Sequence, residues 1–143
     1  MNFGTPGRGH QGDWTLGIDD ARPIFRAAIE QGLFYFDCAD FYGIGACEEL
    51  VGRLLRELAP RDEYVLATKI SMPMGRGANQ GGLSRKHVIE AVDRSLARLG
   101  LDYVDHLVIH RHPHGLPGQA QLPIEESLEA LHDVVKAGKA LYL

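Results

Sequence analysis

The sequence predicts an α/β fold built on a parallel sheet, and three features of the chain point to it. Helical and strand-like patterns alternate through the 143 residues, with a repeat of roughly 30–40 residues that is typical of parallel βα units. Links from helix to strand are short, whereas two of the links from strand to helix are long and irregular. In parallel α/β folds the long loops lie at the carboxyl ends of the strands, where ligands bind. We therefore expect one domain over residues 1–143, with its site at that edge of the sheet.

The composition is that of an ordinary folded protein and excludes several classes of function. Hydrophobic residues make up 45% of the chain and charged residues 24%, and the net charge is −4. Without a long basic run, nucleic acid is not an expected partner. No apolar stretch approaches the roughly 20 residues of a membrane span, so no membrane partner is expected. The two cysteines, Cys38 and Cys47, have neither CxxC spacing nor a disulfide framework, which favours a reduced, cytoplasmic compartment.

Apolar residues spaced three and four apart predict four helices. These stripes cover residues 21–29, 46–58, 85–99 and 124–135. We expect Asp19 or Asp20 to cap the first helix, with Pro23 in its first turn, where proline is tolerated. Ser84 is expected to cap the third helix. Glycines are expected to end three of the helices, at Gly32, Gly100 and Gly138.

Four short runs of apolar, β-branched and aromatic residues predict the strands. The runs lie at residues 33–36, 64–68, 103–109 and 140–143. The first of them is expected to be a buried strand. Residues 1–18 are rich in glycine and lack any periodicity, so they are expected to form a loop.

Polar side chains with acid–base chemistry follow the first three strands. One carboxylate and one phenol follow the first strand, and an amine and an imidazole end the second and the third. These residues are Asp37, Tyr42, Lys69 and His110. Because the carboxyl ends of parallel strands meet at one edge of a sheet, we expect the four side chains to converge in one pocket.

Such a set suits the protonation of a carbonyl oxygen. A phenol is a weak acid at neutral pH, and a neighbouring ammonium group favours its ionised form. A carboxylate beside the lysine keeps the ammonium charged and fixes its position, while a histidine can orient a carbonyl oxygen or assist the proton transfer. Since no side chain supplies hydride, reduction of the carbonyl needs a cofactor as the hydride donor.

Three motifs at these strand ends resemble those of the aldo-keto reductases. They are Asp37-Cys38-Ala39-x-x-Tyr42-Gly43, Ala67-Thr68-Lys69 and the run from Asp102 to His110. Supporting matches lie within residues 82–87, 95–100 and 123–139, so the resemblance covers nearly the whole chain. The loop pattern is most similar to the bacterial and fungal members, which reduce varied aldehydes and ketones.

The resemblance implies a reaction and a role for each site residue. Tyr42 would be the general acid, Lys69 the ammonium group that promotes its ionisation, and Asp37 the partner of Lys69. His110 would orient the carbonyl of a small aldehyde or ketone, which is reduced to an alcohol. The family uses NADPH, and the contacts to this cofactor in this part of the chain would include Asp37.

The resemblance also implies a (β/α)8 barrel, of which the chain would hold about four βα units. A complete barrel needs about 250 residues, so an incomplete domain is expected, most simply a truncated product or a fragment. Most groups that hold the cofactor lie in the family's later strands. Two unpaired sheet edges predict marginal stability or self-association. A second hypothesis therefore stays open, that of an inactive remnant or a non-catalytic binding module like the reductase-fold subunits of channels.

Two other motifs offer different interpretations. Residues 7–12 match GxGxxG, but a dinucleotide fingerprint needs a preceding strand and an immediate helix, so a loop over the barrel mouth is expected instead. His110, His112 and His114 alternate along an extended segment and could meet a metal ion. Pro113 and the lack of carboxylate and lysine ligands disfavour that reading, a metal-dependent hydrolase. Candidates for a substrate wall are Trp14, Met72, Met74 and His112.

Overall fold

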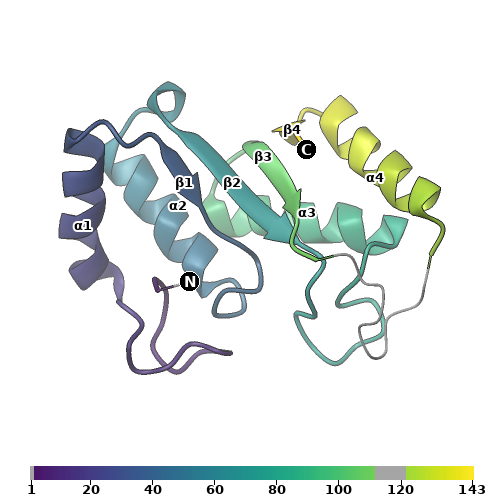
Figure 1. Ribbon diagram of the computed structural model, residues 1–143, viewed down its shortest axis with the longest axis horizontal. Coiled ribbons are helices and arrows are strands. Elements are labelled where there is room, and N and C mark those ends of the chain that lie inside the picture. Colours follow the sequence, from purple (N-terminus) through teal and green to yellow (C-terminus); the bar gives the residue numbers. More distant parts are fainter. Residues whose placement is uncertain (1, 112–121) are drawn as a thin grey trace.

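The computed structural model describes residues 2–111 and 122–143, which form a four-stranded sheet whose neighbouring strands are all parallel (Figure 1). The strands lie side by side in chain order, and a helix precedes each of them. The elements are α1 (Ile18–Glu30), β1 (Tyr35–Asp37), α2 (Ala46–Leu58), the 3-10 helix η1 (Arg61–Glu63), β2 (Val65–Ile70), α3 (Arg85–Leu99), β3 (Val104–Ile109), α4 (Ile124–Lys136) and β4 (Ala140–Tyr142). This arrangement confirms the predicted α/β fold with parallel strands.

Helices α2 and α3 follow the predicted patterns closely. The α2 stripe buries Leu54 and Leu55 completely. At the start of α3 the Ser84 hydroxyl accepts a hydrogen bond from the His87 backbone N–H at 3.2 Å, which is the expected cap. Gly100 ends α3 in the left-handed conformation (φ 66°), which a residue with a side chain rarely adopts.

The start of α1 differs from the prediction. Gly17 is the N-cap, and its carbonyl accepts the first helical hydrogen bond from Ala21. Asp19 and Asp20 therefore lie inside the first turn instead of capping it, where their charge suits the positive end of the helix dipole. Pro23 lies in the second turn, not the first, so the helix lacks one backbone hydrogen bond there.

Strand β1 begins later and is more exposed than predicted. It spans Tyr35–Asp37 instead of residues 33–36, and its last residue pairs with Ala67 of β2. Phe34, just before the strand, is 61% exposed. The expectation of a buried first strand is wrong, because within the described residues no strand pairs with the other edge of β1.

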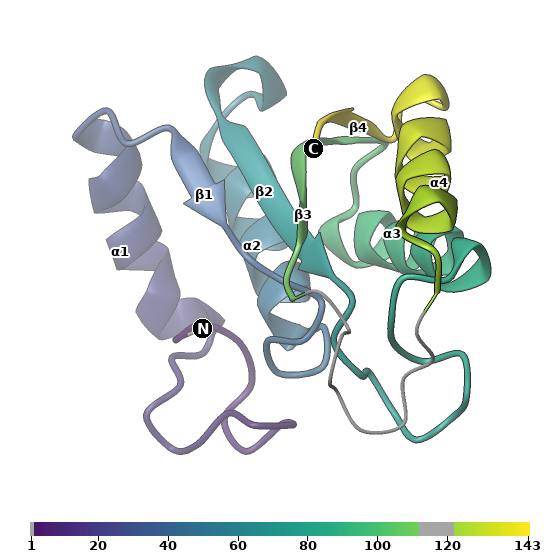
Figure 2. The ribbon, with the colours of Figure 1, turned by 45° about the vertical axis from the view of Figure 1, so that its right-hand side comes forward.

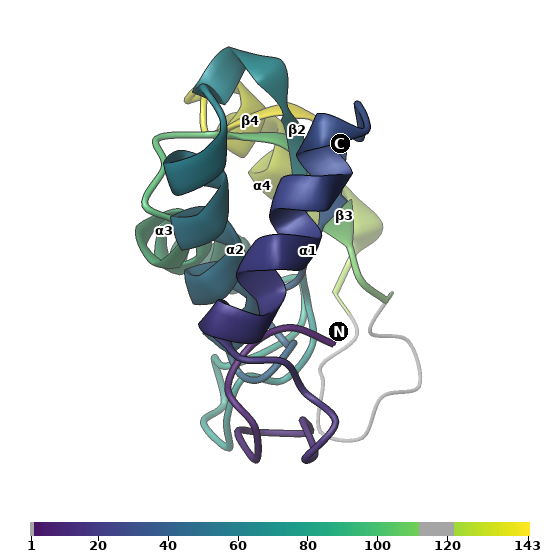
Figure 3. The same cartoon turned by 90° about the vertical axis from the view of Figure 1, so that its left-hand side faces the viewer.

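The helices cover one face of the sheet. Figure 3 shows α2 and α3 on the same side of β2 and β3. Successive side chains of a strand point to opposite faces, and Leu66 and Leu107 point into the buried core on the helix side. The opposite, open face presents Tyr35, Lys69 and His106 at greater exposure. The core therefore lies between sheet and helices, and the open face is left for polar groups.

The loops that leave the strands gather at their carboxyl ends, next to the N-terminal segment (Figure 2). Residues 38–45 connect β1 to α2, and residues 71–84 connect β2 to α3. The N-terminal loop pairs with itself through one bridge, between Phe3 and Leu16. No helix in residues 2–111 and 122–143 is both long and apolar enough to cross a membrane.

Candidate active site

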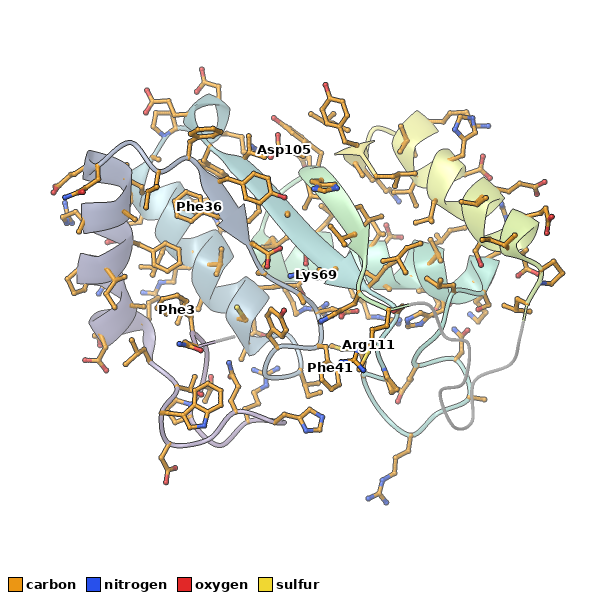
Figure 4. All side chains as sticks on the ribbon, in the orientation of Figure 1. Phe3, Phe36, Phe41, Lys69, Asp105 and Arg111 are labelled. Carbon is orange, nitrogen blue, oxygen red and sulfur yellow. The ribbon has the colours of Figure 1, made fainter. Side chains whose placement is uncertain are left out.

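Strands β1 and β2 bring Asp37 and Lys69 together at the carboxyl end of the sheet, where Figure 4 labels Lys69. Asp37 pairs with Ala67, two residues before Lys69 and on the same face. Lys69 Nζ donates to Asp37 Oδ2 at 2.5 Å and to the Cys38 carbonyl oxygen at 2.8 Å. The Lys69 side chain is 15% exposed and that of Asp37 47%. Two acceptors thus fix the ammonium group, while the carboxylate stays within reach of a ligand.

The loop after β1 places Tyr42 beside this ion pair. Its hydroxyl oxygen lies 3.4 Å from Lys69 Nζ, and the ammonium lies 4.9 Å from the centroid of the phenol ring. The loop turns through Gly43 and Gly45 with left-handed backbone angles (φ 62° and 87°), which glycine adopts without strain. The first turn of α2 secures the loop, because the Cys47 N–H donates to the Tyr42 carbonyl at 3.2 Å.

His110 follows β3, and its ring lies against that of Tyr42, which follows β1. The two rings are nearly perpendicular (89°), with centroids 5.4 Å apart. The His110 backbone N–H donates to the Ile70 carbonyl at 2.9 Å, which extends the pairing of β2 and β3 to the site. Its Nδ1 atom is buried and has no hydrogen-bond partner among the residues that the structure describes. A bound ligand with a polar group is the kind of partner that such an atom needs.

Burial and charge set the protonation states of this pocket. Burial lowers the pKa of Lys69, but the hydrogen bond and charge of Asp37 outweigh it, and the net pKa is raised. Burial lowers the pKa of His110, and the positive charges of Lys69 and Arg111 lower it further. At neutral pH the pocket therefore holds an ammonium group and a neutral imidazole beside the Tyr42 hydroxyl. These groups can donate a proton and a hydrogen bond to a carbonyl oxygen.

The structure brings all four predicted site residues to one place, and their catalytic roles stay predictions. Trp14 lies in the N-terminal loop, 51% exposed. The GxGxxG segment is not followed directly by a helix, since α1 begins at Ile18, which disfavours the dinucleotide fingerprint. Met72 and Met74 lie in the loop that follows β2.

The proposed metal ligands cannot be placed as a set. His112 and His114 lie outside the described residues, so the interpretations that depend on them, a substrate wall and a metal site, stay predictions. Within residues 2–111 and 122–143, no three His, Cys, Asp or Glu side chains come close enough to hold a metal ion.

Sequence reasoning missed a set of polar groups behind the pocket. Glu48 is fully buried on α2, where it accepts hydrogen bonds from Thr68 on β2 and Arg98 on α3. Asp40 is 1% exposed, and neither of its carboxylate oxygens has a hydrogen-bond partner within the described chain. Burial, followed by the charge of Glu48, raises the pKa of Asp40 to about 7. For Glu48 the sequence did contain a signal of burial, because this residue shares the α2 face of Val51 and Leu55.

A model of the aldo/keto reductase family matches residues 1–143. The chain belongs to this family. Its relatives in the family include L-glyceraldehyde 3-phosphate reductase of Escherichia coli strain K12, to which it is 41% identical over 130 residues, or 88% of this chain and 36% of that protein. It is also 40% identical over 128 residues to a probable voltage-gated potassium channel subunit beta of Arabidopsis thaliana, over 89% of this chain and 37% of that protein.

The structure is also similar to that of solved aldo-keto reductases. One, from Klebsiella pneumoniae in complex with NADPH, matches with a TM-score of 0.70 at 29% identity, over 87% of this chain and 38% of that one. The sheet therefore corresponds to part of a (β/α)8 barrel, which confirms the predicted fold class. The chain spans less than half the length of each of these relatives.

Proposed function

We propose that this pocket belongs to an oxidoreductase that reduces the carbonyl group of a small aldehyde or ketone with NADPH. The observation that supports it most is the contact of Lys69 Nζ with both Asp37 Oδ2 (2.5 Å) and the Tyr42 hydroxyl (3.4 Å). An amine held by a carboxylate against a phenol suits proton donation to a developing alkoxide.

Each residue then has a defined task. Tyr42 donates its phenolic proton to the substrate oxygen as the negative charge develops there. The Lys69 ammonium stabilises the phenolate that remains, and Asp37 holds the ammonium in place and keeps it charged. His110, neutral at pH 7 because burial lowers its pKa, donates a hydrogen bond that orients the carbonyl oxygen.

One residue of the pocket suits contact with NADPH. When bound, NADPH supplies the hydride that reduces the carbonyl carbon. Asp37 is the residue that we propose for contact with the cofactor, since its side chain is 47% exposed at the edge of the sheet. Within residues 2–111 and 122–143, His110 Nδ1 is buried without a hydrogen-bond partner, which supports a polar ligand in this pocket. The solved relative that contains NADPH supports this choice of cofactor.

A pair of tyrosine variants tests the assignment. NADPH binding is followed by cofactor fluorescence, and turnover by NADPH absorbance with an aromatic aldehyde as substrate. Loss of a general acid lowers turnover by about 10²–10⁴-fold, so we expect that loss in Tyr42→Phe with NADPH binding retained. Tyr103→Phe is the matched control, because Tyr103 packs against Arg61 instead of the pocket. Full turnover in Tyr42→Phe would exclude Tyr42 as the acid.

A second candidate is a non-catalytic binding module or inactive remnant. It is favoured by the 40% identity to the Arabidopsis channel subunit, whose name describes a role in a channel. We propose residues 1–143 as an incomplete reductase domain, consistent with the share of the relatives that it spans. If NADPH fluorescence does not change on mixing with the protein, this candidate replaces the enzyme.

We further propose that the 143-residue polypeptide self-associates through its sheet edges and works in the cytoplasm. Within the described residues β1 and β4 each have one strand neighbour, and Phe34 and Tyr142 at these edges are 61% and 71% exposed. Exposed apolar edges favour pairing with another chain. Sedimentation of a single monomeric species at all concentrations would exclude self-association.

The two free, buried cysteines suit a reducing compartment such as the cytoplasm, which localisation of a fluorescent fusion can test.

A further inference from the structure

Behind the pocket, on the helix side of the sheet, lies a cluster of three polar residues that we call the buried cluster: Glu48, Thr68 and Arg98. Glu48 is 0% exposed. Its Oε1 accepts a hydrogen bond from the Thr68 hydroxyl at 2.5 Å, and its Oε2 accepts one from Arg98 Nε at 2.6 Å. Both carboxylate oxygens are thus used, and three different elements, α2, β2 and α3, are tied together at one point.

The buried cluster forms the rear half of a closed chain of contacts around the pocket. Thr68 and Lys69 are neighbours on β2, so they point to opposite faces: Lys69 toward the Tyr42 hydroxyl and Thr68 toward Glu48. Glu48 in turn follows Cys47, whose N–H donates to the Tyr42 carbonyl. The loop of Tyr42 is therefore attached to β2 in front through its side chain and behind through Glu48, in addition to the backbone hydrogen bond from the Asp40 N–H to the Lys69 carbonyl at 3.1 Å.

Arg98 joins the same loop from α3. Its side chain lies against Gly45, and a Cβ atom at that position would collide with it. Gly45 is also the N-cap of α2 and donates its N–H to the Asp40 carbonyl at 2.7 Å. Arg98 Nη2 further donates to the Ser95 hydroxyl at 3.1 Å, which fixes the guanidinium on its own helix. The loop is thus clamped at its far end as well.

Stability alone is a weak reason for this arrangement. Replacing a buried ion pair with apolar residues of similar size is often neutral or stabilising, because burying charges opposes much of their attraction. What a fully hydrogen-bonded buried pair supplies is a single geometry, since its donors and acceptors fit in only one way. The geometry fixed here is that of residues 38–45 relative to β2, which determines the Tyr42–Lys69 contact.

We propose that Glu48 is a positioning residue: by bonding Thr68 and Arg98 it holds the Tyr42 loop on β2 and keeps the phenol within reach of Lys69. The inference rests on the proposed function for its catalytic meaning. Its structural content, a loop that opens when the buried cluster is broken, stands apart from activity and is tested separately.

The two cysteines of the chain provide a built-in probe of loop opening. Cys38 begins the loop and Cys47 follows it, at 0% and 1% exposure. Burial raises the pKa of the Cys47 thiol to about 11, so a thiol reagent reacts with it chiefly after the loop opens.

Thr68→Val removes the hydroxyl that bonds Glu48 while keeping the shape of the side chain. Loss of a hydrogen bond to a charged group shifts an opening equilibrium by a factor of about 10–100. We therefore expect thiol labelling of Thr68→Val in native buffer to accelerate by that factor.

Two further variants separate positioning from general destabilisation. Thr68→Ser restores the hydroxyl and should label at close to the wild-type rate. Asp105→Asn breaks an ion pair with Arg61 at the end of the sheet opposite Lys69, where Figure 4 labels Asp105. It should lower global stability in urea without selective exposure of the thiols. If Thr68→Val labels no faster than Asp105→Asn at matched stability, or if Thr68→Ser behaves like Thr68→Val, the inference is wrong.

Turnover adds a second, distinguishable result. In Thr68→Val we expect kcat for aldehyde reduction to fall about tenfold or more with NADPH affinity within about twofold of wild type, since the change displaces the acid and leaves Asp37 in place. An equal loss of kcat and of NADPH affinity would contradict positioning. If the wild-type protein itself shows no turnover, the proposed function fails, and thiol labelling still decides whether Glu48 holds the loop.

Discussion

The two faces of the four-stranded sheet differ in burial and in chemistry. On the helix side, Leu66, Ile70 and Leu107 are at most 2% exposed and belong to one apolar core. On the open face, Lys69 meets Asp37 and Tyr42, and farther from the site the Tyr35 hydroxyl bonds His106 Nδ1 at 2.9 Å. The same strands supply both sets of side chains, because their direction alternates along each strand.

This difference separates two requirements, a stable core and a polar pocket. Apolar burial on one face supplies the free energy of folding, so the other face is free to hold groups that would destabilise a core. The buried cluster of Glu48, Thr68 and Arg98 is one of the polar groups that the described chain buries on the apolar side. It lies directly behind Lys69, which suggests that the site determines its position.

The largest effect is expected on activity, from a substitution on the open face of the sheet. Lys69→Met removes the ammonium that contacts Tyr42 and Asp37, and we expect turnover with an aromatic aldehyde to fall by about 10²–10⁴-fold. The urea midpoint should change little, since the partner carboxylate is half exposed and such pairs contribute about 1 kcal/mol or less. Lys139→Met, which breaks the exposed pair with Asp93, is the control and should keep full turnover.

The next largest effect is expected on stability, from a substitution in the core between the sheet and the helices. Leu66→Ala leaves a cavity in a fully buried position, and we expect the free energy of unfolding to fall by about 2–5 kcal/mol in urea titration. Phe34→Ala removes a larger apolar side chain that is 61% exposed. Its effect should stay below about 1 kcal/mol. Comparable losses in the two variants would mean that the edge of β1 is covered by another chain.

The sequence was sufficient to predict that these side chains converge, because they lie at strand ends. Alternating strands and helices place successive carboxyl ends at one edge, so the meeting of Asp37, Lys69 and His110 follows from chain order alone. Tyr42 follows too, since it lies in a short loop directly after β1. The helices were predictable wherever one apolar stripe faced one core, as in α2 and α3.

What the sequence did not predict depends on contacts between distant elements. Glu48 and Arg98 are 50 residues apart, so the helical face that Glu48 shares with Val51 and Leu55 indicates burial but does not show which groups it bonds. The exposure of β1 was missed for a similar reason, because an apolar run does not show how many neighbours a strand has. The cap of α1 was missed because Gly17 competes with Asp19 through backbone geometry alone.

Asp40 is a second buried carboxyl group, and it has no hydrogen-bond partner in the described chain. Its folded pKa is raised to about 7, chiefly by burial, whereas an unfolded aspartate titrates near 3.9. Between these values the folded state keeps a proton that the unfolded state loses. Stability therefore falls as pH rises from about 4 to 7 and then levels off.

Asp40→Asn should remove this dependence. Near pH 4 wild type and variant should unfold with similar free energies. By pH 8 we expect the variant to be more stable by about 2 kcal/mol, less than the full linkage value of about 1.4 kcal/mol per pKa unit because the folded chain relaxes around a buried charge. Urea titrations across this range measure the difference, and a constant difference at all pH values would show that Asp40 titrates normally. Asp62→Asn, an exposed acid in η1, is the control.

The smallest effect is expected on the open face away from the site, at the hydrogen bond between Tyr35 and His106. The two side chains meet across β2 because Ala67, which pairs with His106, is small. Tyr35 is 50% exposed, so water competes for the bond, and a double-mutant cycle of Tyr35→Phe and His106→Leu should give a coupling of about 0.5 kcal/mol. A coupling above about 2 kcal/mol would require two side chains that are shielded from water, which would contradict the exposure of this face. A coupling that grows with protein concentration would show that a second copy of the chain covers this face.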